Sequence, residues 1–167
     1  MDPHSESAKM ASGPKPTPPS TPKTARQQAM ALLASADPAQ LTEMVDALPV
    51  STAHEIVRPA ETGLVMARGR MGGTGSPFNL GEVTVTRCVV RLPSGEIGSA
   101  YTLGRNKQHT RNAAICDALR QHPAHTVVID SMIITPLAEM HDAARHLVKA
   151  ETAATKVDFF TMVRGDD

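Results

Sequence analysis

The stretch LGEVTVTRCVVRLPSGEIGSAYTL, residues 80–103, decides the fold of this 167-residue chain. Valine and threonine dominate its first half, and such β-branched side chains suit the pleated surface of a strand. The Pro-Ser-Gly-Glu sequence at 93–96 is typical of a tight turn. We therefore predict a strand over 80–92, a turn, and an antiparallel return strand over 97–103.

The segments on either side of this hairpin alternate between helical and extended patterns. Helical spacing of apolar residues predicts one helix after Thr24 and a second helix after Asp37. In the second helix, Asp37 is the expected N-cap, Pro38 is the first-turn proline, and Pro49 ends the helix. The other expected elements are extended segments at 54–59 and 63–71 with a break at 60–62, a helix at 109–121, an extended segment at 127–134, and a last helix from Pro136 to about Thr155. This order predicts an α+β fold, in which an antiparallel β-meander has flanking helices, an N-terminal helix pair and a long C-terminal helix.

The composition restricts both the domain organisation and the classes of function. Residues 1–23 are rich in proline and are expected to be a disordered tail, whereas residues 24–167 are expected to form a single domain that includes a C-terminal docking tail at 156–167. Lys plus Arg and Asp plus Glu both number 17, and only 2% of residues are aromatic. No overall positive field and few stacking rings are available, so nucleic-acid binding is disfavoured.

The two cysteines and the apolar runs indicate a location. Cys88 and Cys116 lie in separate apolar segments and not in a close pair, which fits reduced thiols in the cytoplasm. No apolar run is long enough for a membrane span, and none resembles a signal peptide. We therefore expect a cytoplasmic chain with no membrane segment.

Basic residues and glycines gather at 68–75. Alternate strand positions would place Arg68 and Arg70 on one face, beside the flexible backbone of Gly72, Gly73, Thr74 and Gly75. Guanidinium groups and bare amides are what phosphate oxygens require, so these residues are candidates for phosphate or substrate binding. The spacing matches no nucleotide-binding fingerprint, and the alternative is a surface loop whose arginines pair with carboxylates.

Further candidates lie along the hairpin and after it. Arg87 and Arg91 rise from an otherwise apolar strand face and could meet an anion or a partner subunit, or could extend along the edge with their charged ends in water. Arg105 and His109 stand at the entry to the helix at 109, where an anionic group could bind. His109 is also a candidate for acid or base catalysis, and the alternative is that it caps or packs the helix. The histidine spacings do not indicate a metal site.

The C-terminal segment concentrates large apolar side chains where chain ends are normally polar. It contains Phe159, Phe160 and Met162, followed by Arg164. We expect it to dock, either on its own domain or on another subunit, because aromatic and methionine side chains are favoured in interface cores.

Three runs in the chain resemble the PhnG family: AETGLV at 60–65, RMGGTG at 70–75 and VDFFTMVRGD at 157–166. LGR at 103–105, QH at 108–109 and DAL at 117–119 follow the same order, so the resemblance covers residues 24–167. It implies a subunit of the carbon-phosphorus lyase core complex of phosphonate catabolism, assembled with PhnH, PhnI and PhnJ and present in two copies.

The same resemblance implies an activity. PhnG, PhnH, PhnI and PhnL together would transfer the ribose 5-triphosphate part of ATP to methylphosphonate and release adenine, and PhnI would supply the main catalytic groups. The chain would bind no cofactor by itself, ATP with magnesium would be a substrate of the complex, and the iron-sulfur cluster and S-adenosylmethionine would belong to PhnJ. The alternative is a scaffold subunit that only assembles the complex.

Overall fold

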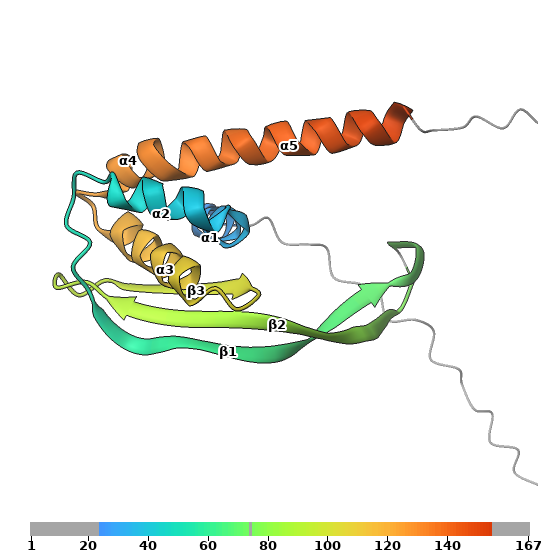
Figure 1. The fold of residues 1–167 in the computed structure, drawn as a ribbon, viewed down its shortest axis with the longest axis horizontal. Helices are drawn as coiled ribbons and strands as arrows, with labels where there is room; N and C mark the ends of the chain where they lie inside the picture. The colour runs from blue at the N-terminus through green and yellow to red at the C-terminus, as the bar shows by residue number, and fades with distance from the viewer. Residues whose placement is uncertain (1–23, 74, 155–167) are drawn as a thin grey trace, which may run out of the picture.

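The structure, a computed structural model, describes residues 24–73 and 75–154 of the chain. It confirms the α+β fold: a three-stranded antiparallel sheet of order β1-β2-β3 carries all of the helices on one face (Figure 1). The strands are β1 (Glu55–Arg70), β2 (Pro77–Arg91) and β3 (Ile97–Leu103), and a short 3₁₀ turn, η1 (Met71–Gly73), follows β1. We call the face under the helices the helix side and the other face the open side.

The N-terminal helix pair forms as predicted. In α1 (Ala25–Ser35), the Thr24 hydroxyl accepts from the Gln27 amide while the Gln27 side chain reaches back to the Thr24 amide, so two unpaired donors are satisfied. In α2 (Pro38–Asp46), one Asp37 carboxylate oxygen accepts from the amides of Ala39 and Gln40. Local side-chain chemistry therefore fixes where both helices begin.

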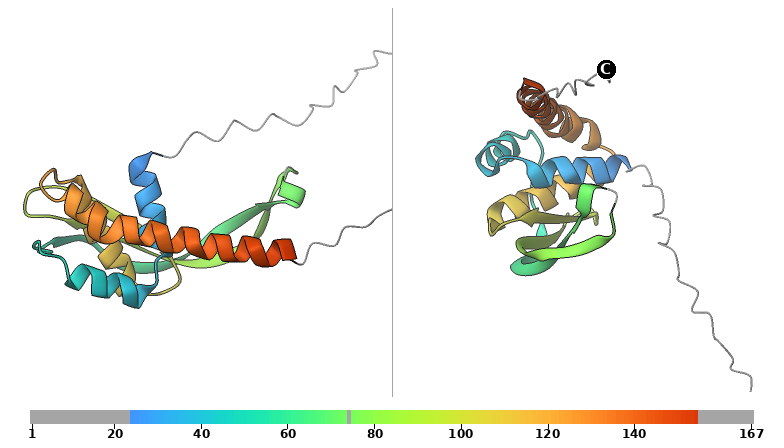
Figure 2. Two further views of the ribbon diagram at one scale, coloured as in Figure 1. Left: turned by 90° about the horizontal axis from the view of Figure 1, so that it is seen from above. Right: turned by 90° about the vertical axis from the view of Figure 1, so that its right-hand side faces the viewer.

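Helix α3 (Lys107–Gln121) lies directly on the sheet, and α1 and α2 lie above it (Figures 1 and 2). Its approach to β3 depends on Gly98, because a Cβ atom there would lie 2.0 Å from the Ala114 carbonyl oxygen and 2.7 Å from the Ala118 Cβ. The largest fully buried apolar side chains of the core come from helices and sheet alike: Leu33, Leu41, Val90, Leu119, Ile129 and Ile133.

The predicted break at 60–62 is wrong, because β1 is a single strand of 16 residues. Pro59 has no amide hydrogen to donate to β2. The pairing of β1 with β2 is irregular around it, between Ile56 and Arg58 and between Arg58 and Glu61, and the strand continues past the proline. The strand β2 is also longer than predicted and begins at Pro77.

The predicted extended segment at 127–134 is also wrong, because the chain there is helical. Helix α4 (Thr126–Ile129), a π-helical turn η2 (Asp130–Ile134) and α5 (Thr135–Ala154) follow one another without a break. The Thr135 amide donates to the Asp130 carbonyl, five residues back. Pro136 has no amide hydrogen and its ring crowds the preceding turn, so a widened turn just before it accommodates the proline within the helix.

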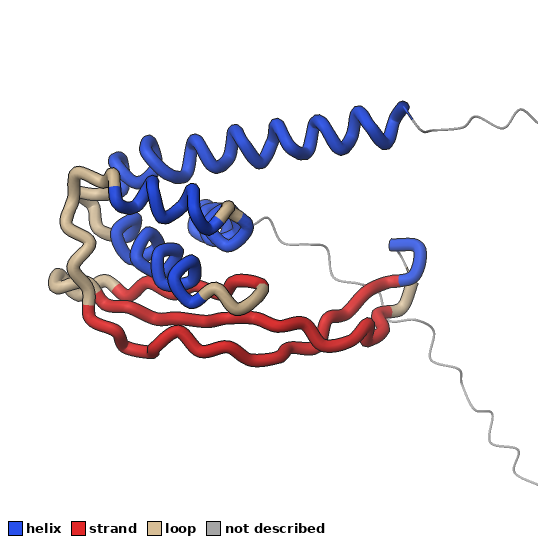
Figure 3. Tube along the Cα trace, viewed as in Figure 1, coloured by secondary structure: helices blue, strands red, loops and turns tan. Residues whose placement is uncertain are grey.

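Strands β1 and β2 extend far beyond β3, which stops where Leu103 pairs with Val85 (Figure 3). The remaining two-stranded ribbon, Leu64–Arg70 with Pro77–Thr84, is called the arm here. Helix α5 points toward the same end of the molecule, and its residues from Glu139 to Ala153 are all exposed. None of the helices within the described ranges has the length and apolar character that a membrane crossing needs.

Candidate functional site

The predicted arginine pair lies at the end of the arm. Arg68 stands opposite Asn79 and Arg70 opposite Pro77, and both side chains are exposed. As alternate residues of one strand they share a face, as the sequence predicts. That face is the helix side, because Thr62, further along the same alternation, hydrogen-bonds the buried Thr86 beneath the helices at 3.1 Å.

The glycine turn beyond them is held by its own hydrogen bonds. Gly72 has a φ of 59°, the Gly75 amide donates to the Met71 carbonyl at 2.9 Å, and Arg70 Nη1 donates to the Gly75 carbonyl at 3.1 Å. Gly73 closes the 3₁₀ turn, and Thr74 lies outside the described residues. Because the Gly75 amide is already bonded within the turn, it is not available to an anion at this tip.

Arg105 is exposed in the connection between β3 and α3, at the base of the arm. The Gly104 amide donates to the Thr84 carbonyl, which fixes the level of this loop along β2. Arg70 lies opposite Pro77, so about seven strand positions, or roughly 23 Å, separate the two levels. The structure therefore places Arg105 and the arginine pair in two different regions of the surface.

His109 is buried, with 5% of its surface exposed, and it joins α3 to α1. Its Nε2 lies 2.9 Å from the Leu33 carbonyl oxygen and must donate, since a carbonyl only accepts. The His109 amide donates to Asn106 Oδ1 at 3.0 Å, so Asn106 caps the start of α3. A histidine enclosed and bonded in this way packs the domain, and the structure gives no support to a catalytic role.

Arg87 and Arg91 lie on the open side of the sheet and pair with carboxylates across the strand. Arg87 is 3.5 Å from Glu61, and Arg91 is 3.6 Å from Glu55. All four side chains are about half exposed or more, so these ion pairs are screened and weak. A hollow of about 320 Å³ beside Arg87 is lined in part by Tyr101 and Val85. This face remains available to a partner.

Sequence reasoning missed a buried carboxylate in α3. Asp117, 3% exposed, accepts from Arg26 Nε at 2.9 Å, from Arg26 Nη2 at 2.8 Å and from the Ser99 amide at 2.9 Å. This bonding raises the pKa of Arg26, although burial works against the rise. The three residues tie α1, α3 and β3 together, and their distance along the chain explains why no local pattern signalled them.

Sequence reasoning also missed Arg111, which extends from α3 over the helix side of the sheet. Its Nε is buried, and no group among the described residues accepts a hydrogen bond from it. Burial raises the pKa of the nearby Cys88 thiol, and the Arg111 charge partly offsets that rise. A buried donor without an acceptor is uncommon, so an acceptor from elsewhere is expected at this place.

Both cysteines are buried free thiols. Burial, reinforced by the Asp117 charge, raises the pKa of Cys116 to about 12. The thiolate is the reactive form of cysteine, so neither residue is suited to nucleophilic chemistry.

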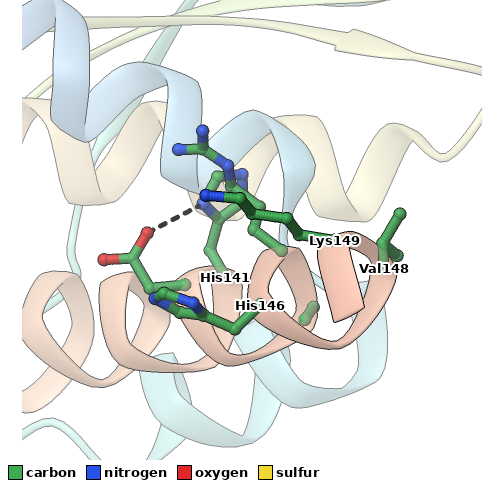
Figure 4. Close-up of a pocket in the computed structure, with 7 residues that line it drawn as sticks. His141, His146, Val148 and Lys149 are labelled. Carbon is green, nitrogen blue, oxygen red and sulfur yellow. Dashed lines mark ion pairs between the residues drawn. The ribbon is translucent and has the colours of Figure 1, made fainter. Parts of the chain in front are cut away.

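A larger hollow, of about 760 Å³, lies beside α5 and is shown in Figure 4. His141, Arg145, His146 and Lys149 line it, and Asp142 lies 3.7 Å from His141 as an ion pair when the histidine is protonated. Every side chain around it is exposed, so it is an open groove and not an enclosed pocket. Within residues 24–73 and 75–154, no three His, Cys, Asp or Glu side chains gather closely enough to hold a metal ion.

The remaining interface candidates, Phe159, Phe160, Met162 and Arg164, lie outside the described residues, as does the predicted disordered tail at 1–23. The geometry of the described domain thus provides an exposed arm with arginines at its tip, an open sheet face and a projecting helix. It brings no nucleophile, base and orienting group together in one pocket.

Comparison with known proteins identifies the kind of chain that has this architecture. The family described as Phosphonate metabolism protein PhnG matches residues 24–165. The chain belongs to the PhnG family. A relative from Rhizobium meliloti (strain 1021), the alpha-D-ribose 1-methylphosphonate 5-triphosphate synthase subunit PhnG, is 48% identical over 142 residues, which are 85% of this chain and 90% of that protein. The family match confirms the resemblance seen in the sequence and includes most of the segment that follows α5.

Proposed function

We propose that this chain acts in phosphonate metabolism as the PhnG subunit of alpha-D-ribose 1-methylphosphonate 5-triphosphate synthase. The observation that carries this proposal is the 48% identity to the Rhizobium meliloti subunit over nearly the full length of both chains. The chain is a subunit of a transferase complex and does not act as an autonomous enzyme.

The reaction we propose for the complex is a substitution at the anomeric carbon of ATP. A phosphonate oxygen of methylphosphonate forms a bond to C1′ of the ribose, the bond from C1′ to the adenine nitrogen breaks, and adenine leaves with the electron pair and takes up a proton. PhnH, PhnI and PhnL are the proposed partners, with PhnI supplying the main catalytic groups. ATP with magnesium is a substrate of the complex, and this chain holds no cofactor of its own.

We further propose that the chain assembles with PhnH, PhnI and PhnJ in the cytoplasm and is present in two copies, as a homodimer within the complex. The later cleavage of the carbon-phosphorus bond, with its iron-sulfur cluster and S-adenosylmethionine, is assigned to PhnJ. In this arrangement Arg68 and Arg70 help to bind the substrate's phosphates at a surface shared with a partner. A guanidinium group can donate two parallel hydrogen bonds to the oxygens of one phosphate, and both arginines are exposed.

A second role, that of a scaffold without substrate contacts, is favoured by the exposed apolar side chains of the arm and of α5. Leu64, Leu80 and Leu147 are each at least 60% exposed, and exposed apolar side chains in such numbers mark protein contacts. The two roles differ in what the arginines do.

The Arg70→Ala variant discriminates between these roles. If Arg70 binds phosphate, the purified complex should assemble normally and form less ribosylated product. Arg58→Ala is the matched control, because Arg58 is an exposed arginine of the same strand and belongs to none of the candidate sites. Loss of assembly with normal activity in the remaining complex would instead make Arg70 an interface residue.

The synthase role itself is tested by adenine release. Co-purified PhnH, PhnI and PhnL are incubated with ATP and methylphosphonate, with and without this chain. Release that requires the chain supports the synthase role. Release at the same rate without it would contradict that role and leave only assembly for the later lyase step.

A further inference from the structure

The helix side of the arm is an exposed surface with no covering layer in the described domain. Helices cover this side of the sheet as far as the contact between Thr62 and Thr86, and the arm continues beyond it. Leu64 and Met66, which follow on the same face, are 60% and 49% exposed. A two-stranded ribbon is marginally stable in water by itself, so burial of these side chains by another segment would stabilise the arm.

The same surface carries positive charge that the described domain does not neutralise. Arg68 lies next to Met66 on this face, and Arg111 lies over the helix side of the sheet near Cys88, in the three-stranded part next to the arm. Among the described residues, neither guanidinium has a hydrogen-bond acceptor or a carboxylate within ion-pair distance. The segment that covers this surface therefore needs both apolar side chains and carboxylates.

The chain itself contains such a segment, directly after α5. Residues 155–167 include the apolar side chains of Phe159, Phe160, Met162 and Val163. The segment also has the carboxylates of Asp158, Asp166 and Asp167, which outnumber its two basic side chains, Lys156 and Arg164. The family match continues through this segment to residue 165 but leaves out residues 1–23. The segment is therefore part of what the family shares, whereas the proline-rich beginning of the chain is not.

The position of α5 makes the surface accessible to this segment. The views in Figures 1 and 2 both place the C-terminal end of α5, whose last residue is Ala154, at the same end of the molecule as the tip of the arm. An extended chain advances about 3.4 Å per residue, so Phe160 can lie up to roughly 20 Å from Ala154 and the complete segment can span roughly 44 Å. The arm strand from Leu64 to Arg70 is about 20 Å long, which is less than half of the span of the complete segment.

We propose that residues 155–167 turn back from the end of α5 and cover the helix side of the arm in the same chain. In this arrangement the phenylalanine and methionine side chains pack on Leu64 and Met66. One aspartate pairs with one edge of the Arg68 guanidinium, which leaves its other donors and Arg70 free to bind phosphate. The segment becomes the missing part of the helical layer and stiffens the arm that carries the arginine pair. This inference rests on the geometry of the arm and does not depend on the synthase role.

Disulfide trapping in the full-length chain tests the proposal. The test variant combines Met66→Cys with Phe160→Cys, and the matched control combines Leu80→Cys with Phe160→Cys. Leu80 lies on the other face of the arm, where its side chain contacts the Gly69 position, and it is as accessible as Met66, with 65% exposed. Cys88 and Cys116 stay in both variants because they are buried.

After mild oxidation, peptide mass spectrometry should find the intramolecular link in the Met66 variant and little of it in the Leu80 variant. Equal linking in both variants would show a segment without a preferred position and would overturn the proposal. Linking between two chains would also overturn it, since the segment would then cover the arm of a second copy.

A second measurement does not depend on new cysteines. Hydrogen exchange in residues 62–70 should be faster in a chain that ends at Ala154 than in the full-length chain, because the covering segment is lost. The part of β2 that lies outside the arm gives an internal control, since exchange in residues 85–91 should change little. Unchanged exchange in residues 62–70 would refute the fold-back.

Discussion

Replacing Gly98 with alanine should separate α3 from the sheet. The added Cβ would lie 2.0 Å from the Ala114 carbonyl oxygen, 2.5 Å from the Ala118 amide nitrogen and 2.7 Å from the Ala118 Cβ. Two of these three atoms belong to the helix backbone, which cannot turn aside as a side chain can. The whole helix must move outward, and its contacts with β2 and β3 must loosen with it.

The size of the effect follows from the cost of overpacking a core. Such substitutions cost about 1–3 kcal/mol, and a clash with helix backbone belongs at the upper end, about 3 kcal/mol. The described residues 24–73 and 75–154 number 130. A domain of that size has an unfolding entropy of about 0.27 kcal/mol/K at its midpoint, so Gly98→Ala should lower Tm by about 11 °C.

Calorimetry or circular dichroism on the full-length chain measures this change, and Gly63→Ala is the matched control. A Cβ at Gly63, also a strand glycine, would meet no atom within 4 Å, so that variant should stay within about 0.5 kcal/mol of the wild type. Equal midpoints for the two variants would refute the conclusion that only glycine allows α3 to lie so close to β3.

Two further predictions concern charge and thiols. Arg26→Ala leaves the buried Asp117 carboxylate without its main partner and should lower the free energy of unfolding by about 2 kcal/mol, measured by urea denaturation. This is below the usual cost of breaking a buried pair, because Arg26 is 46% exposed. Arg87→Ala, the control, should lose less than about 0.5 kcal/mol, and an equal loss in the two variants would contradict this prediction. Cys116 has a folded pKa of about 12 against an ordinary value of 9.0, so the stability that its neutral thiol contributes is present below pH 9 and is lost as the pH rises toward 12. The urea midpoint should fall over that range, and alkylation below pH 9 should require denaturant; rapid labelling of the native chain would exclude the buried thiol.

The sequence predicts those elements whose signals are local. Thr24 and Asp37 indicate where their helices begin, because a capping side chain bonds to amides within three residues of it. The structure contains both caps. The meander follows from β-branched composition and a turn at 93–96, and it forms with the predicted neighbours. The alternation of Arg68 and Arg70 likewise needs only the geometry of one strand.

The errors arise where local composition and burial disagree. The run at 127–134 is rich in β-branched and apolar residues, which favours a strand, yet Ile129, Ile133 and Leu137 recur every four residues and are buried on one helix face. Val127 is 77% exposed, so its strand preference is overridden. Attention to the four-residue spacing would have predicted this helix.

Other features of the site depend on contacts between distant parts of the chain. Asp117 meets Arg26 across 91 positions, and His109 meets Leu33 across 76. No periodicity within either helix distinguishes such a residue from an exposed one. The buried polar network and the enclosed histidine therefore became visible only in the folded domain.

The placement of Tyr101 has a practical consequence for spectroscopy. The chain contains one tyrosine and no tryptophan, and Tyr101 is 49% exposed on the open side, opposite Arg87. All intrinsic fluorescence of the isolated chain at tyrosine wavelengths therefore comes from one known place on the sheet. A binding partner that contains neither tyrosine nor tryptophan leaves Tyr101 as the source of this emission. If it changes the quenching by iodide or acrylamide, it contacts the open side, and if it leaves the quenching unaltered, it binds elsewhere. The protein thus carries its own unlabelled reporter for mapping its contacts.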